Sequence, residues 1–98
     1  MLKPEQFYYD VLAQSEIPEG MHDGIVLYLL HGLPPGNFLS AVLSNDLAEA
    51  VNRADEQNAK ALAAYVKFIY QHFPINAWGT AQHVSDWMNY RRAAKVVA

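Results

Sequence analysis

The sequence predicts an all-α fold, with one domain of five to six short helices. Apolar residues recur every three or four positions along nearly the whole chain, and no segment alternates as a half-buried strand does. The 98 residues suffice for one hydrophobic core and are too few for two. Because 52 % of the residues are apolar and only 17 % are charged, the composition argues against disorder. We expect a single domain over residues 1–98, with its core over about residues 5–92 and a frayed C-terminal tail.

The first two predicted helices start near prolines, which suit the first turn of a helix. After Pro4, four apolar residues share one helical face: Phe7, Tyr8, Val11 and Leu12. The pattern restarts at residues 17–19, after which another four share one face: Met21, Ile25, Tyr28 and Leu29. Because residues 25–30 are all apolar, we expect the second helix to be the most buried.

A helix stop and a helix start lie close together in residues 31–38, which read His31-Gly32-Leu33-Pro34-Pro35-Gly36-Asn37-Phe38. Gly32 is predicted to end the second helix in the left-handed conformation, and Pro34 to hold the residue before it extended. Pro35 is predicted to be the first residue of the third helix. The core face of that helix carries Phe38, Leu39, Val42 and Leu43.

Cap residues separate the later helices. Ser44-Asn45-Asp46 is predicted to precede a short helix over residues 47–54. Asp55 is predicted to cap the longest helix, which Pro74 ends. Five residues of that helix keep a three-four spacing and are expected to face the core: Ala59, Leu62, Val66, Ile69 and Phe73.

The last predicted helix follows a loop over residues 75–79 and is capped by Thr80. Its apolar side carries Val84, Trp87 and Met88. Three basic residues near its C-terminal end are expected to oppose its dipole: Arg91, Arg92 and Lys95. Residues 96–98 are expected to fray.

No residue pattern points to catalysis. The chain has no cysteine, its serines lie in no nucleophile elbow, and no glycine-rich phosphate-binding motif occurs. A zinc site needs three or four ligands, whereas the nearest arrangement, His83 with Asp86, supplies two. We therefore expect no enzyme activity, no metal and no cofactor.

The aromatic residues supply the favoured functional surface. Four Phe, six Tyr and two Trp are more than a domain of this size easily buries, and Tyr and Trp are enriched at protein interfaces. We expect a surface for a protein partner or a homodimer that includes Tyr65, Phe68, Tyr70, Trp78 and Tyr90. The alternative is that the longest helix lies centrally and buries both of its faces.

A second hypothesis places a small anionic or nucleotide-like ligand at the start of the third helix, where backbone N–H groups are free. The candidate residues are His31, Gly36, Asn37, Phe38 and Asn45. A tight elbow that packs two helices accounts for the same residues. A third hypothesis, a small enzyme, has no motif to support it.

Charge is unevenly distributed along the chain. Residues 1–49 hold one basic and seven acidic side chains, whereas residues 50–98 hold six basic and three acidic. This asymmetry fits two solvated surfaces, opposite charged faces or head-to-tail association. The basic strip near Tyr90 is too small to favour nucleic-acid binding by an acidic chain. Because no signal peptide or membrane-spanning run occurs, we expect no membrane contact and a cytoplasmic location.

Five segments resemble a group of small uncharacterised proteins of tailed bacteriophages and prophages, whose shared core reads HG-PPG-FL-AVL-NDL. These segments are Ile25-Val26, His31–Leu39, Ala41–Leu47, Ala54–Asn58 and Ala77–Thr80. The resemblance covers about residues 18–88. It implies the cytoplasm of a bacterial host and an accessory role, such as host takeover or the blocking of a defence system. It supplies no catalytic residues.

Overall fold

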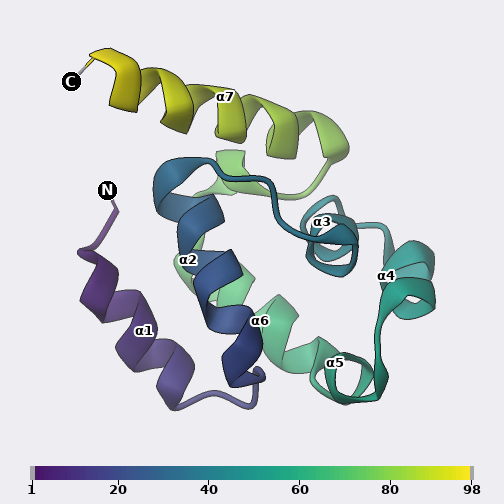
Figure 1. Cartoon of the computed structure of the whole chain (residues 1–98). Coiled ribbons are helices and arrows are strands. Elements are labelled where there is room, and N and C mark those ends of the chain that lie inside the picture. The colour runs from purple at the N-terminus through teal and green to yellow at the C-terminus, as the bar shows by residue number, and fades with distance from the viewer. Residues whose placement is uncertain (1, 98) are drawn as a thin grey trace.

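The structure is a computed structural model that describes residues 2–97 (Figure 1). Its helices are α1 (Glu5–Ala13), η1 (Glu19–Met21), α2 (His22–His31), α3 (Asn37–Leu43), α4 (Leu47–Arg53), α5 (Glu56–Lys60), α6 (Leu62–His72), η2 (Ile75–Ala77) and α7 (Ala81–Val97). The elements labelled η are short 3-10 helices. No strand occurs among the described residues, so the all-α prediction is confirmed. Residues 2–97 form seven α-helices rather than five or six.

Helix α2 lies at the centre of the fold, as its apolar sequence predicts. Ile25, Val26, Tyr28 and Leu29 are all completely buried. Helix α1 packs along α2, and α7 crosses its C-terminal end (Figure 1). Because apolar side chains surround α2 on several sides, the other helices share one hydrophobic core around it.

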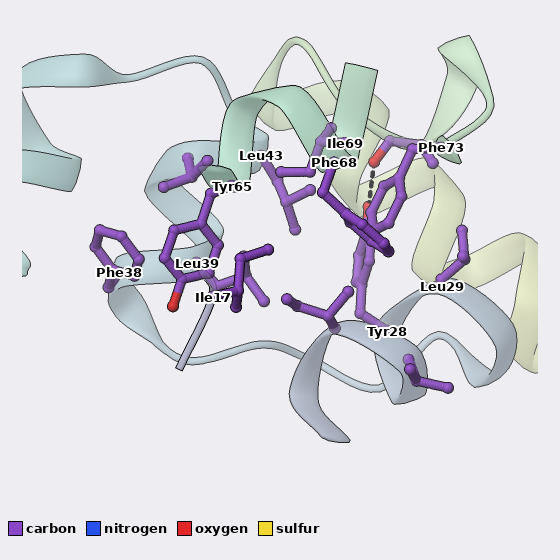
Figure 2. Close-up of a cluster of buried hydrophobic side chains, with 14 of the residues drawn as sticks. Ile17, Tyr28, Leu29, Phe38, Leu39, Leu43, Tyr65, Phe68, Ile69 and Phe73 are labelled. Carbon is purple, nitrogen blue, oxygen red and sulfur yellow. Dashed lines mark hydrogen bonds between the residues drawn. The ribbon is translucent and has the colours of Figure 1, made fainter. Parts of the chain in front are cut away.

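The core is rich in aromatic rings (Figure 2). Tyr28 stacks on Phe73 with the ring centroids 6.1 Å apart, and Phe38 meets Tyr65 edge to face at 5.1 Å. The hydroxyl groups of Tyr28 and Tyr65 also make hydrogen bonds. The Tyr28 hydroxyl donates to the Ala77 carbonyl oxygen, and the Tyr65 hydroxyl donates to Asn58 Oδ1, each at 2.6 Å.

The prediction of one long helix between Asp55 and Pro74 is wrong. The chain turns at Ala61, which divides this segment into α5 and α6. The N–H of Ala61 is shared between the carbonyl oxygens of Gln57 and Asn58, which tightens the turn. Helix α6 is thereby rotated, so that Tyr65 and Phe68 face the core. Of the five residues predicted to face the core, Ile69 and Phe73 are buried. Leu62 is half-buried, and Ala59 and Val66 are exposed.

Gly32 ends α2 as predicted, with φ at +69°. Its N–H donates to the Tyr28 carbonyl, which is the hydrogen bond of an αL cap, and the N–H of Leu33 donates to the Leu27 carbonyl. The predicted start of α3 at Pro35 is wrong. Gly36 is the extended N-cap, and its carbonyl accepts the first helical bond, from the N–H of Ser40 at 2.9 Å.

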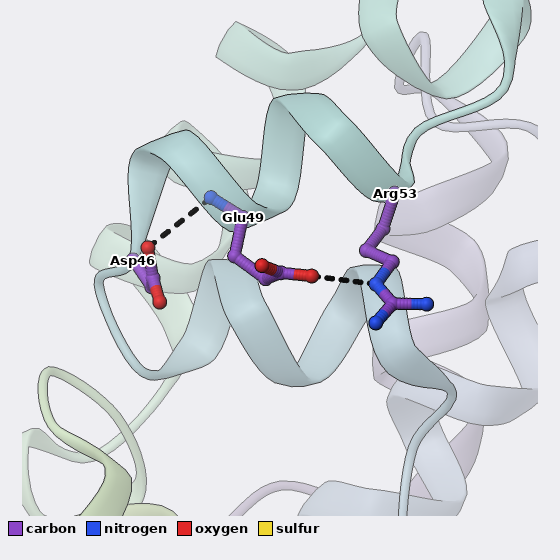
Figure 3. Close-up of polar contacts among 3 residues, drawn as sticks. All are labelled: Asp46, Glu49 and Arg53. Carbon is purple, nitrogen blue, oxygen red and sulfur yellow. Dashed lines mark hydrogen bonds and ion pairs between the residues drawn. The ribbon is translucent and has the colours of Figure 1, made fainter.

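Three predicted cap residues are confirmed by hydrogen bonds to backbone N–H groups three positions later. Asp46 accepts from Glu49, whose carboxylate also pairs with Arg53 (Figure 3). Asp55 accepts from the N–H of Asn58 at 2.8 Å. Thr80 Oγ1 accepts from the N–H of residue 83 at 3.0 Å. Helices α4, α5 and α7 therefore begin directly after their cap residues.

Helix α7, with 17 residues, is longer than α5 and α6. It continues to Val97, past the position where fraying was expected, and Ala98 lies outside the described residues. The predicted loop before it contains the single turn of η2. Each helix within residues 2–97 is too short or too polar to span a lipid bilayer.

Tyr28 and Tyr65 generate a prediction for alkaline pH. Burial raises the pKa of both hydroxyls above the ordinary value of about 10. The unfolded chain loses these protons above about pH 10 while the folded chain keeps them, so the free energy of unfolding falls as the pH rises. The slope is about 1.4 kcal/mol per pH unit for each tyrosine.

Urea unfolding at pH 7 and above pH 10 measures this effect. Tyr28→Phe should lower stability at pH 7 by about 1–2 kcal/mol, because it leaves the Ala77 carbonyl without its donor. It should also make the alkaline decline shallower. Tyr70→Phe, at an exposed position, is the control. An unchanged alkaline slope in Tyr28→Phe would show that Tyr28 titrates equally in both states.

Candidate binding groove

Side chains of α7 bind the last carbonyl groups of α2. Trp87 Nε1 donates to the Leu29 carbonyl oxygen at 3.1 Å, and Arg91 Nε donates to that of Leu30 at 2.9 Å. Arg92 Nε donates to the Gly32 carbonyl oxygen at 3.1 Å. The arginines were expected to oppose the dipole of their own helix. Instead they satisfy acceptors of another helix, whose C-terminal end attracts positive charge.

Gly32 allows this close crossing. A Cβ atom at Gly32 would lie 2.6 Å from the carbonyl oxygen of Met88 and 3.0 Å from Cβ of Arg91. Only a residue without a side chain therefore fits between α2 and α7 at this point.

A groove of about 810 Å³ lies beside the crossing. It is bordered by the N-terminal segment, the end of α2, η2 and α7, and the N-terminal segment and α7 lie near the same end of α2 in Figure 1. Its lining residues are Leu2, Lys3, Leu30, Pro74, Asn76, Asp86, Trp87, Tyr90 and Arg91. The lining joins residues from both ends of the chain.

The aromatic wall of the groove has one fixed and one exposed ring. Trp87 is buried and held by its bond to the α2 backbone. Tyr90 is 60 % exposed, and its ring centroid lies 5.5 Å from that of Trp87. The Arg91 guanidinium carbon lies 5.8 Å from the centroid of the Tyr90 ring. The wall therefore offers a rigid apolar surface beside a cation.

The charged groups of the groove are two cations and one carboxylate. Lys3 Nζ lies 5.7 Å from the centroid of the Phe7 ring, and the backbone N–H of Lys3 donates to the Tyr8 hydroxyl at 2.9 Å. Neither Lys3 nor Arg91 makes an ion pair within the described part of the chain. The carboxylate of Asp86 accepts a hydrogen bond from Gln82 Nε2 at 2.9 Å.

The predicted aromatic surface is not one surface. Tyr65 is completely buried and Phe68 is 4 % exposed, so these two residues belong to the core, although α6 does not bury both of its faces. Tyr70, which is 74 % exposed, and the half-buried Trp78 meet edge to face at 6.1 Å. Of the five residues, Tyr90 alone lines the groove.

The five residues of the predicted ligand site at the start of α3 do not form one site either. Phe38 is buried in the core, while Gly36, Asn37 and Asn45 are exposed. His31 is half-buried, and its Nδ1 has no hydrogen-bond partner among the described residues.

Asn37 lines a shallow depression of about 280 Å³, which none of the other four candidates borders. The same depression contains the carboxylates of Asp46 and Glu49, and its one arginine, Arg53, is already paired with Glu49 (Figure 3). Since these carboxylates repel an anion, the geometry gives the anionic ligand no support here.

Sequence reasoning missed most of the groove. The sequence pattern places Trp87 on the apolar side of its helix, where it is buried, and Arg91 near the C-terminal end, and neither pattern indicates a groove. No local pattern relates Lys3 to residues 86–91, because the groove forms only when the N-terminal segment and α7 pack beside α2.

Two further sources of functional information are possible metal ligands and similarity to known proteins. No cluster of three His, Asp or Glu side chains in residues 2–97 could hold a metal ion. No family profile, curated protein or solved structure matches this chain. The functional argument therefore rests on the groove.

The crossing at Gly32 generates a stability prediction. Gly32→Ala should lower the free energy of unfolding by about 2–4 kcal/mol, because it adds left-handed strain and a clash with the Met88 carbonyl. Urea unfolding measures the change.

Two glycines with open space around them provide controls. Gly24→Ala, inside α2, should raise stability by about 0.5–1 kcal/mol. Gly36→Ala, at the N-cap of α3, should cost less than about 1 kcal/mol. A loss at Gly32 no larger than the loss at Gly36 would contradict the close packing of α7 on α2.

Proposed function

We propose that this protein acts by binding a segment of a protein partner in the groove between the N-terminal segment, η2 and α7. The observation that carries the proposal is the pairing of a fixed Trp87 with an exposed Tyr90 beside the cation of Arg91. Tyr, Trp and Arg are the residues that most often dominate binding energy at protein interfaces.

The size and rigidity of the groove support this proposal. Its volume of about 810 Å³ is within the range of roughly 300–1,000 Å³ that is usual for binding pockets. Trp87 and Arg91 are held by backbone carbonyls of α2, so binding would order few further side chains. A preordered surface loses less conformational entropy on binding than a mobile one.

The lining residues favour binding over catalysis. They include no serine, histidine or cysteine, and their carboxylate, that of Asp86, is exposed and bonded to Gln82. A nucleophile with an adjacent base is the usual requirement for covalent catalysis, and the groove lacks such a pair.

The resemblance to small tailed-phage and prophage proteins suggests the setting. We propose a target in the cytoplasm of a bacterial host, with host takeover or the blocking of a defence system as the biological role. A second copy of the chain is the other partner that the groove could bind, and it is tested alongside.

Affinity capture from a bacterial lysate tests the proposal with two matched variants. Tyr90→Ala removes the exposed ring of the groove, and Tyr70→Ala removes an exposed ring on α6 that lies outside it. Neither change should alter stability by more than about 0.5 kcal/mol, since surface substitutions are usually neutral. A partner of the groove should be lost with Tyr90→Ala and retained with Tyr70→Ala.

The opposite pattern, loss with Tyr70→Ala alone, would move the interaction to the Tyr70–Trp78 pair and contradict the groove. Light scattering over a concentration series separates the two kinds of partner. A dimer that Tyr90→Ala dissociates would identify the partner as a second copy.

A further inference from the structure

We infer that the groove selects an acidic peptide segment, in which a bulky apolar side chain lies next to a carboxylate. This inference rests on the proposed function and specifies the chemistry of the partner. It follows from the contrast between the apolar floor of the groove and its two unpaired cations.

The floor sets the apolar part of the preference. Leu30, Pro74 and Trp87 line the groove and supply aliphatic and aromatic surface. The indole N–H of Trp87 is engaged with the Leu29 carbonyl, so the ring presents carbon atoms to an incoming side chain. A leucine or phenylalanine side chain gains most from such a surface, because its burial removes apolar area from water.

Arg91 sets the charged part of the preference. Its Nε is used by the Leu30 carbonyl, which fixes the guanidinium while leaving the Nη atoms without a hydrogen bond among the described residues. A fixed guanidinium with free N–H groups matches the geometry of a carboxylate. Lys3 adds a second cation to the same lining.

The charge of the rest of the chain makes this groove distinctive. The formal net charge is −3, and residues 1–49 carry seven of the ten acidic side chains. In the lining, by contrast, two cations accompany one carboxylate, and that carboxylate already accepts from Gln82. An acidic segment is therefore attracted at the groove and repelled by the acidic side chains of residues 1–49, which favours the groove as the docking site.

A matched pair of peptides tests the inference. The probes are the acetylated and amidated hexapeptide Gly-Glu-Leu-Phe-Glu-Gly and its counterpart with Gln in place of both Glu residues. Titrations are followed by NMR through the two tryptophan indole N–H signals. Trp87 reports on the groove and Trp78 reports on a position outside it.

The acidic peptide should shift the Trp87 signal and bind roughly fivefold or more tightly than the Gln peptide, because hydrogen bonds to charged groups are stronger. Higher salt should reduce the difference. Lys3→Gln should weaken binding of the acidic peptide and leave the Gln peptide nearly unchanged. Lys67→Gln, an exposed lysine on α6 outside the groove, should affect neither.

Each other outcome has a separate meaning. Equal binding of both peptides at Trp87 would overturn the acidic preference and leave the groove as the binding surface. If neither peptide shifts the Trp87 signal, the proposed function at this groove is itself contradicted. A shift confined to Trp78 would contradict binding in the groove and would place the binding surface at the Tyr70–Trp78 pair.

Discussion

The fold depends on the hydrogen bonds that the carbonyl groups at the C-terminal end of α2 accept. This helix is the centre of the core, so its last carbonyl groups are shielded from water and need donors from the protein. The donors come from Trp87, Arg91 and Arg92, which lie 58 to 61 residues away in the sequence. Because all three lie on α7, the crossing position of that helix is fixed by the end of α2.

The groove is a consequence of the same crossing. Trp87 and Arg91 bind the α2 backbone through one nitrogen each, and their remaining surfaces line the groove beside the N-terminal segment. Their stability role and their proposed binding role therefore cannot be separated by substituting them. Tyr90 and Lys3 line the same groove without holding α2, so changes at these two positions report on binding.

The features predicted correctly from the sequence are those whose partners lie close in the chain. Asp46, Asp55 and Thr80 cap N–H groups three residues away, and the conformation of Gly32 follows from its place after an apolar helix. The predicted core face was correct at Ile69 and Phe73 but wrong at Ala59 and Val66, because the tightened turn at Ala61 divides the expected single helix into α5 and α6. The groove could not be predicted, since its two halves meet only through the tertiary packing of α2 and α7.

The large number of aromatic residues has a similar explanation. Tyr28 and Tyr65 are completely buried because their hydroxyl groups find acceptors in the core, at Ala77 and Asn58. A tyrosine with a buried acceptor contributes to packing, as buried polar groups need such partners. Tyr90 is exposed, its hydroxyl makes no bond to the described residues, and its ring lies near both Trp87 and the Arg91 guanidinium. Tyr70 is also exposed, but it lies outside the groove, so the proposed partner surface rests on the position of Tyr90 rather than on the aromatic content as a whole.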